Sequence, residues 1–150
     1  LQPCLFGIGK ETKMAKSVLY FYNPTVGAIA DGGNIPIQVG SIVRRYGCDC
    51  TVSDNTILCK NGGYFDVDVA LTVAAGGTTA TTAALYQDGT LIPGTAVTLT
   101  PTAAGATLYF DLPRSVVRVR GCCCAESRLT VRLTGGTATA GTVSGVVEKV

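Results

Sequence analysis

Apolar and polar residues alternate along much of this sequence, and the alternation constrains the fold more than any other feature. In residues 63–73 every second residue is large and apolar, and the residues between are mostly polar or small. Residues 128–134 repeat the pattern. A period of two is typical of a β-strand with one face in the core and one in water. No long window shows the roughly 3.6-residue apolar period of an amphipathic helix.

Turn signals separate further short strands at intervals of about 8–12 residues, as in sandwiches and barrels. Asp88-Gly89, between two apolar pairs, predicts a tight hairpin. Abundant Thr and Val suit a pleated surface. The other expected strands are residues 18–22, 40–46, 50–53, 56–60, 80–87, 90–92, 96–100, 107–112, 115–120 and 142–149. About ten short strands in one domain predict an all-β fold, a two-sheet antiparallel jelly-roll sandwich.

The composition excludes several classes of protein. The 150-residue chain has a net charge of +2 and no Lys/Arg run, so we expect no nucleic-acid partner. No apolar stretch approaches the roughly 18 residues of a membrane span, so we expect no membrane insertion. There is no His, which removes every His-based triad, general base and metal ligand. We therefore expect a protein that is not an enzyme and carries no cofactor.

Residues 1–16 differ from the rest of the chain. They lack the charged region and long apolar core of an export signal. Met14 is a plausible natural start, because Lys10-Glu11 can be back-translated into a ribosome-binding sequence just before its codon. Residues 1–13 are then a translated leader; the alternative is a genuine flexible arm. The folded domain is expected over residues 17–150.

Three motifs resemble the tumour necrosis factor/complement-head jelly-roll superfamily, and they stand at residues 63–69, 84–89 and 143–150. In that superfamily a Gly-Tyr-aromatic strand precedes a strand ending in an Asn/Asp-Gly turn, and a central apolar strand closes the chain. The resemblance covers residues 17–150. The most similar members are bacterial and phage proteins: heads of spore-surface collagen-like proteins, and phage fibre or decoration proteins. Unlike those heads, this chain has no Gly-X-Y stalk and carries seven cysteines.

The resemblance implies a homotrimer in which the outer surface of one sheet packs around a three-fold axis. It implies a non-enzymatic structural or binding head, on a virion or a bacterial cell surface. The missing export signal favours the virion, because virions assemble in the cytoplasm. A carbohydrate- or receptor-binding head acting through its loops is the alternative, and a hydrolytic enzyme has the least support.

Charged residues on the strand faces are the candidates for subunit contacts. These are Asp66, Asp68, Arg118, Arg120, Arg128 and Arg132. The alternative is a solvated face with cross-strand pairs worth a few tenths of a kcal/mol each. Arg44-Arg45, at a strand end, is a candidate rim feature. Asp66 and Asp68 do not suggest a hydrolase, because no apolar pocket to raise either pKa is evident.

The cysteines allow three interpretations. A turn at Asp54-Asn55 places Cys50 opposite Cys59 at a position where Cα atoms lie about 4.5 Å apart, which predicts a cross-strand disulfide or at least close thiols. Cys48 shares the face of Cys50. Adjacent residues in an extended Cys122-Cys123-Cys124 would point to opposite sides, so at most two serve one site. Structural disulfides within or between subunits, reduced buried thiols, and a metal site of unusual spacing all stay open.

Overall fold

The structure is a computed structural model that describes residues 17–121 and 125–150. Every strand expected from the alternation has a counterpart. The strands are β1 (Val18–Val26), β2 (Ile42–Tyr46), β3 (Cys50–Ser53), β4 (Thr56–Lys60), β5 (Gly63–Ala75), β6 (Thr81–Gln87), β7 (Thr90–Leu91), β8 (Val97–Leu99), β9 (Thr107–Asp111), β10 (Ser115–Val119), β11 (Glu126–Thr134) and β12 (Ala138–Lys149). One 3-10 turn, η1 (Val39–Ser41), precedes β2. The described residues contain no helix that is long and apolar enough to cross a membrane.

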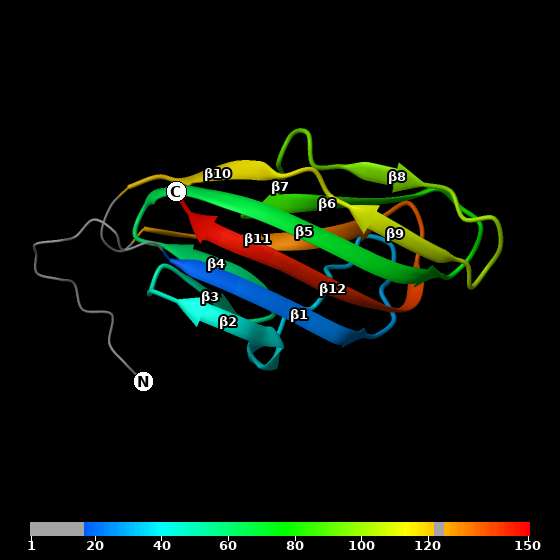
Figure 1. Ribbon diagram of the computed structural model, residues 1–150. Helices are drawn as coiled ribbons and strands as arrows, with labels where there is room; N and C mark the ends of the chain where they lie inside the picture. Colours follow the sequence, from blue (N-terminus) through cyan, green and yellow to red (C-terminus); the bar gives the residue numbers. More distant parts are fainter. Residues whose placement is uncertain (1–16, 122–124) are drawn as a thin grey trace, which may run out of the picture.

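The strands form two six-stranded sheets that pack face to face (Figure 1). Sheet A has the order β10-β5-β12-β1-β2, and β9 also pairs with β5. Sheet B has the order β3-β4-β11-β6-β7, and β8 also pairs with β6. All the strand pairs are antiparallel. The expected all-β, two-sheet jelly-roll sandwich is therefore confirmed.

The core lies between the inner faces of the two sheets. Alternate residues of β5 are buried, from Phe65 to Val73, as are Leu129, Val131 and Leu133 of β11. The largest fully buried side chains are Phe21, Phe65 and Phe110, all from sheet A. The period of two therefore decides which residues form the core.

Tight turns set the strand register. Asp54 and Asn55 have φ angles of 53° and 61°, the left-handed conformation that a two-residue type I′ hairpin requires at both positions. This turn aligns Cys50 with Cys59 in the β3–β4 hairpin, as expected. Asp88 and Gly89 also have positive φ angles, 50° and 84°, and join β6 to β7.

Three side-chain contacts link parts of the sandwich that do not pair as strands: one ion pair and two hydrogen bonds to backbone carbonyl oxygens. Lys149 at the end of β12 contacts Asp49, with its Nζ 3.0 Å from Oδ2, and so ties sheet A to the connection before β3. The Nε of Arg45 donates to the carbonyl oxygen of Cys50 at 2.9 Å, on β3, which is one of the two outermost strands of sheet B. The Nε2 of Gln87 donates to the carbonyl oxygen of Arg118 at 2.8 Å, on β10, which is one of the two outermost strands of sheet A.

Candidate interaction surface

The outer face of sheet A carries an unusual number of large apolar side chains. Because side chains alternate, the strand register places residues of different strands in rows across this face. One row contains Asp68 of β5, Val146 of β12, Tyr20 of β1 and Arg44 of β2. The next row contains Ala70, Ser144 and Tyr22.

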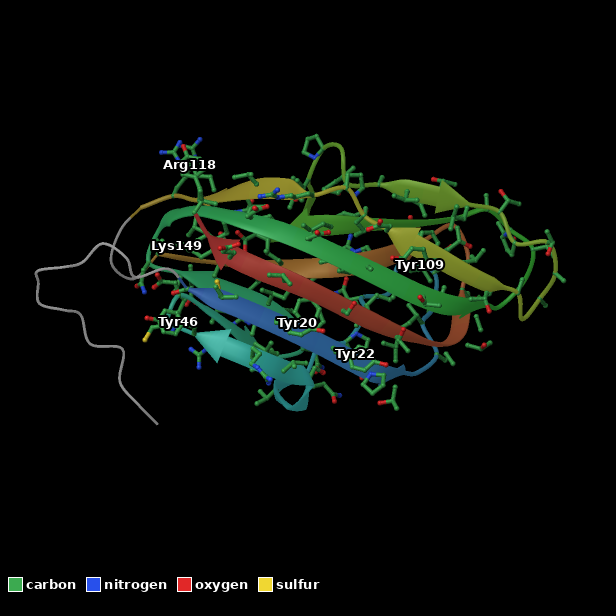
Figure 2. All side chains as sticks on the ribbon, viewed as in Figure 1. Tyr20, Tyr22, Tyr46, Tyr109, Arg118 and Lys149 are labelled. Carbon is green, nitrogen blue, oxygen red and sulfur yellow. The ribbon has the colours of Figure 1, made fainter. Side chains whose placement is uncertain are left out.

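We call six exposed residues of this face the tyrosine face: Tyr20, Tyr22, Tyr64, Tyr109, Val116 and Val146. Figure 2 shows Tyr20, Tyr22 and Tyr109 over the same sheet. Tyr109 and Val116 are the most exposed of the six, at 58% and 59%. Between the tyrosines stand small residues such as Ala70 and Ser144. A wet sheet face is ordinarily polar, and a clustered apolar one indicates an interaction surface.

A buried carboxylate lies beside the tyrosine face. Asp66 belongs to the outward-facing residues of β5, yet it is only 9% exposed. The guanidinium of Arg114 covers it, and its Nε lies 2.7 Å from Oδ1 and 2.8 Å from Oδ2. The Nη2 of Arg114 also donates to Oδ2. These hydrogen bonds hold the pKa of Asp66 below its ordinary value, against the opposing effect of its burial. The negative charges of Asp66, Asp68 and Glu148 raise the pKa of Arg114.

Replacing Arg114 with alanine should raise the pKa of Asp66. The depressed pKa stabilises the folded state at pH values above the ordinary value of about 3.9. That contribution is lost as the pH falls through the lowered pKa. Arg114→Ala should therefore be less stable than wild type at neutral pH, and the difference should shrink in acid. Carboxyl NMR titration and urea unfolding at several pH values measure both effects. Arg120→Ala, which removes an exposed arginine elsewhere, is the control. An unchanged pKa of Asp66 would contradict the role of Arg114.

The expected contact residues fall on both sheets. Asp66, Asp68 and Arg118 lie on the outer face of sheet A, where the guanidinium carbon of Arg118 is 5.7 Å from the centre of the Tyr64 ring. Arg120 is exposed just beyond β10. Arg128 and Arg132 are on β11 in sheet B.

The two arginines of β11 have partners within sheet B and its neighbouring loops. Arg128 donates to the carbonyl oxygen of Ser53 and to Oγ1 of Thr56, both at 3.0 Å. The guanidinium carbon of Arg132 lies 4.2 Å from the centre of the Tyr86 ring. A contact surface made by one sheet can therefore include Asp66, Asp68 and Arg118, and it excludes Arg128 and Arg132.

Sequence reasoning missed the tyrosine face and the pairing of Arg114 with Asp66. Residues 18–22 contained a signal for the tyrosine face. Tyr20 and Tyr22 alternate there with Leu19 and Phe21, so both faces of the strand carry large side chains. A strand that is apolar on both faces is buried on both faces, within a fold or in an assembly.

The cysteines of the β3–β4 hairpin are close thiols. Cys50 and Cys59 are opposite each other, fully buried and free, so the disulfide is not formed and the close-thiol alternative holds. A hydrogen bond with Cys50, followed by burial, raises the pKa of the Cys59 thiol. Cys48 is half-buried in the turn before β3. Cys122, Cys123 and Cys124 lie outside the described residues. Within the described ranges, no group of three or more Cys, Asp or Glu side chains is placed to hold a metal ion.

A shallow groove of about 340 Å³ lies where the outer strands β7 and β10 approach each other. Its lining includes Leu91, Pro93, Val116 and Arg118. Gln87 crosses it by donating to the carbonyl oxygen of Arg118 and to Oγ of Ser127. Among residues 17–121 and 125–150, no carboxylate lines this groove. Asp66 is held by Arg114 on the neighbouring face.

Comparison with models of protein families and with curated proteins gives no match. Solved structures do match. The PRD1 vertex protein P5 has a TM-score of 0.58 and 13% identity, over 89% of this chain and 96% of that chain. Murine APRIL at pH 8.5 has a TM-score of 0.60 and 15% identity, over 90% and 99% of the two chains. Eiger TNF from S. frugiperda has a TM-score of 0.57 and 16% identity, over 89% and 91%.

These similarities extend over almost the whole of each chain while few residues are shared. They concern the path of the backbone and the arrangement of the two sheets. Together with the strand order, they show that this chain has a TNF-like jelly-roll fold.

Proposed function

We propose that the protein is a non-enzymatic structural or binding head that associates with copies of itself through the tyrosine face, as a homotrimer. The observation that carries this proposal is the cluster of six large, exposed apolar side chains on the outer face of sheet A. A virion is the proposed location, as a decoration or fibre protein, and a bacterial cell surface is the alternative.

The chemistry of the tyrosine face suits a protein interface. Tyrosine presents a large ring for burial and a hydroxyl that keeps its contact with water, and it is enriched at interfaces. Apolar burial contributes about 25 cal/mol per Å², and a specific interface covers about 800 Å² of each partner. The residues of the tyrosine face come from five strands of sheet A, β1, β5, β9, β10 and β12.

Two further arguments support the assembly and its location. Members of the superfamily that the sequence resembles form three-fold trimers through the outer surface of one sheet, which favours three copies here. The similarity to a protein described as a vertex protein favours a virion. The protein's low charged fraction of 15% also suits a chain that buries much of its surface in an assembly.

The test is the mass of the purified protein by light scattering, with and without reductant. We expect three times the chain mass of 15.4 kDa in both conditions. The double variant Tyr20→Glu/Tyr22→Glu should be monomeric, because it buries two unpaired charges in the contact. Thr98→Glu, on the outer face of sheet B, is the control and should keep the wild-type mass. Far-UV circular dichroism checks that each variant is folded.

A monomeric wild-type protein in both conditions would overturn the proposed assembly. A larger polymer that dissociates on reduction would replace it with a disulfide-linked coat or fibre. Dissociation of Thr98→Glu alone would move the contact to sheet B. In the monomeric case the groove between β7 and β10 favours the second candidate function, a carbohydrate- or receptor-binding head, because it combines apolar walls with an arginine.

A further inference from the structure

The tyrosine face lies between charges of opposite sign. Asp68 of β5 and Glu148 of β12 are on one side of Tyr20, and Arg44 of β2 is on the other. Asp68 and Arg44 are exposed, and Glu148 is half-buried. Positive groups also lie on the β5 side, because Arg114 pairs with Asp66 and Arg118 lies over the ring of Tyr64. Asp68 and Glu148 add negative charge there, and Arg44 adds positive charge on the β2 side.

None of these three charges has a salt-bridge partner within residues 17–121 and 125–150. The ion pairs formed there join Arg114 to Asp66, Arg128 to Asp54, and Lys149 to Asp49. Arg44 donates only to the carbonyl oxygen of its neighbour Val43, at 3.0 Å. Two strands separate β5 from β2, a distance of about 14 Å at the usual strand spacing, so Arg44 cannot meet Asp68 within one chain.

We propose that Arg44 of one copy pairs with Asp68 and Glu148 of the next copy when two tyrosine faces, or parts of them, come together. The inference rests on the proposed self-association and names the residues that orient it. The occupant of the face is a second copy, because one copy carries both halves of a complementary charge pattern. Arg45 takes no part, because its guanidinium turns to the carbonyl oxygen of Cys50.

The charges and the tyrosines have separate tasks in this interface. The tyrosines provide the apolar area that drives association. Charges beside such an area mainly determine which orientation is accepted, because opposing like charges is costly. A contact from the positive side of one copy to the negative side of the next is heterologous, and such a contact generates a closed ring when the rotation closes.

Charge reversal tests the pairing. Arg44→Glu and Asp68→Lys should each weaken self-association at least about tenfold, measured as the concentration dependence of mass by analytical ultracentrifugation. The combined variant Arg44→Glu/Asp68→Lys should recover part of the association, because it restores opposite charges between positions 44 and 68 while Glu148 stays negative. Arg132→Glu, the same charge change on β11 of sheet B, is the control and should behave as wild type.

A mixture of the two single variants tests the symmetry. In Arg44→Glu both position 44 and position 68 are negative, and in Asp68→Lys both are positive. In a two-fold dimer of one copy of each variant, position 44 of either copy therefore faces the opposite charge at position 68 of the other, so the mixture should associate. In a head-to-tail ring of three, a mixture always leaves at least one contact between like charges, so it should not form the trimer that the combined variant forms. We expect the second result. Full wild-type association by the mixture would support the pairing in a dimer and overturn its place in a trimer.

The outcomes separate this inference from the proposed function. If Arg44→Glu and Asp68→Lys keep wild-type association while Tyr20→Glu/Tyr22→Glu dissociates, the pairing is wrong and the tyrosine interface stands. If the combined variant fails to recover association, the pairing is also wrong. If the wild-type protein is monomeric, both the proposed self-association and the proposed charge pairing are wrong.

Discussion

Truncating Phe21 to alanine should lower the free energy of unfolding by about 3–5 kcal/mol, as for large aromatic residues in well-packed cores. Phe21 is fully buried on the inner face of β1. Its strand pairs with β12 on one side and β2 on the other, so neighbouring backbone on both sides limits collapse into the cavity. Urea unfolding followed by circular dichroism measures the loss.

The control for Phe21→Ala is Tyr22→Ala, the next residue of the same strand. Tyr22 is 45% exposed on the opposite face, so its truncation leaves no internal cavity. The comparison has to be made at protein concentrations where the chain is monomeric, because association would add to the apparent stability. Equal losses for the two variants would contradict the assignment of Phe21 to the core and Tyr22 to the surface.

Adding a methyl group at Gly145 should destabilise the fold by about 1–3 kcal/mol, the usual cost of overfilling a core. A Cβ there would lie 2.7 Å from Cζ of Phe21 and 2.8 Å from the carbonyl oxygen of Asp68. Gly145 is the strand partner of Phe21, so β12 has no side chain at the position where β1 carries its largest buried one. Thermal and urea unfolding of Gly145→Ala measure the effect.

Two comparisons separate overfilling from the general cost of replacing a glycine. Gly40→Ala should be nearly neutral, because no atom lies within 4 Å of its added Cβ. In the background of Phe21→Ala, the Gly145→Ala change should cost less than it does alone, because one of its two clashes is gone. The contact with the backbone of Asp68 persists, so part of the cost should remain. Strict additivity would contradict the packing described.

Local rules made much of the fold predictable from the sequence. The alternation in residues 63–73 reports burial directly, and β5 forms there with the expected core face. The Asp54-Asn55 turn determines the pairing of Cys50 with Cys59, because a two-residue hairpin fixes register. Residues 40 and 41 were expected in a strand and form part of η1, where Oγ of Ser41 accepts a hydrogen bond from the backbone of Gln38.

The rest of the candidate site depends on contacts between distant parts of the chain. Arg118 and Arg132 both alternate with valine or leucine, so nothing local tells that β10 joins sheet A and β11 joins sheet B. The pairing of Arg114 with Asp66 joins residues that are far apart in sequence. The redox state of Cys50 and Cys59 also cannot be predicted from spacing, since the same register suits a disulfide and two thiols.

Arg45 and Gln87 bear on a different property, the resistance of the folded protein to fibril formation. Sandwiches with open margins expose rows of unpaired backbone groups that recruit further strands without limit. Here a side chain donates a hydrogen bond to a carbonyl oxygen on one of the two outermost strands of each sheet, that of Cys50 on β3 and that of Arg118 on β10. Where these oxygens are taken, lateral growth by strand addition is hindered. The proposed contact through the tyrosine face does not use these margins of the sheets.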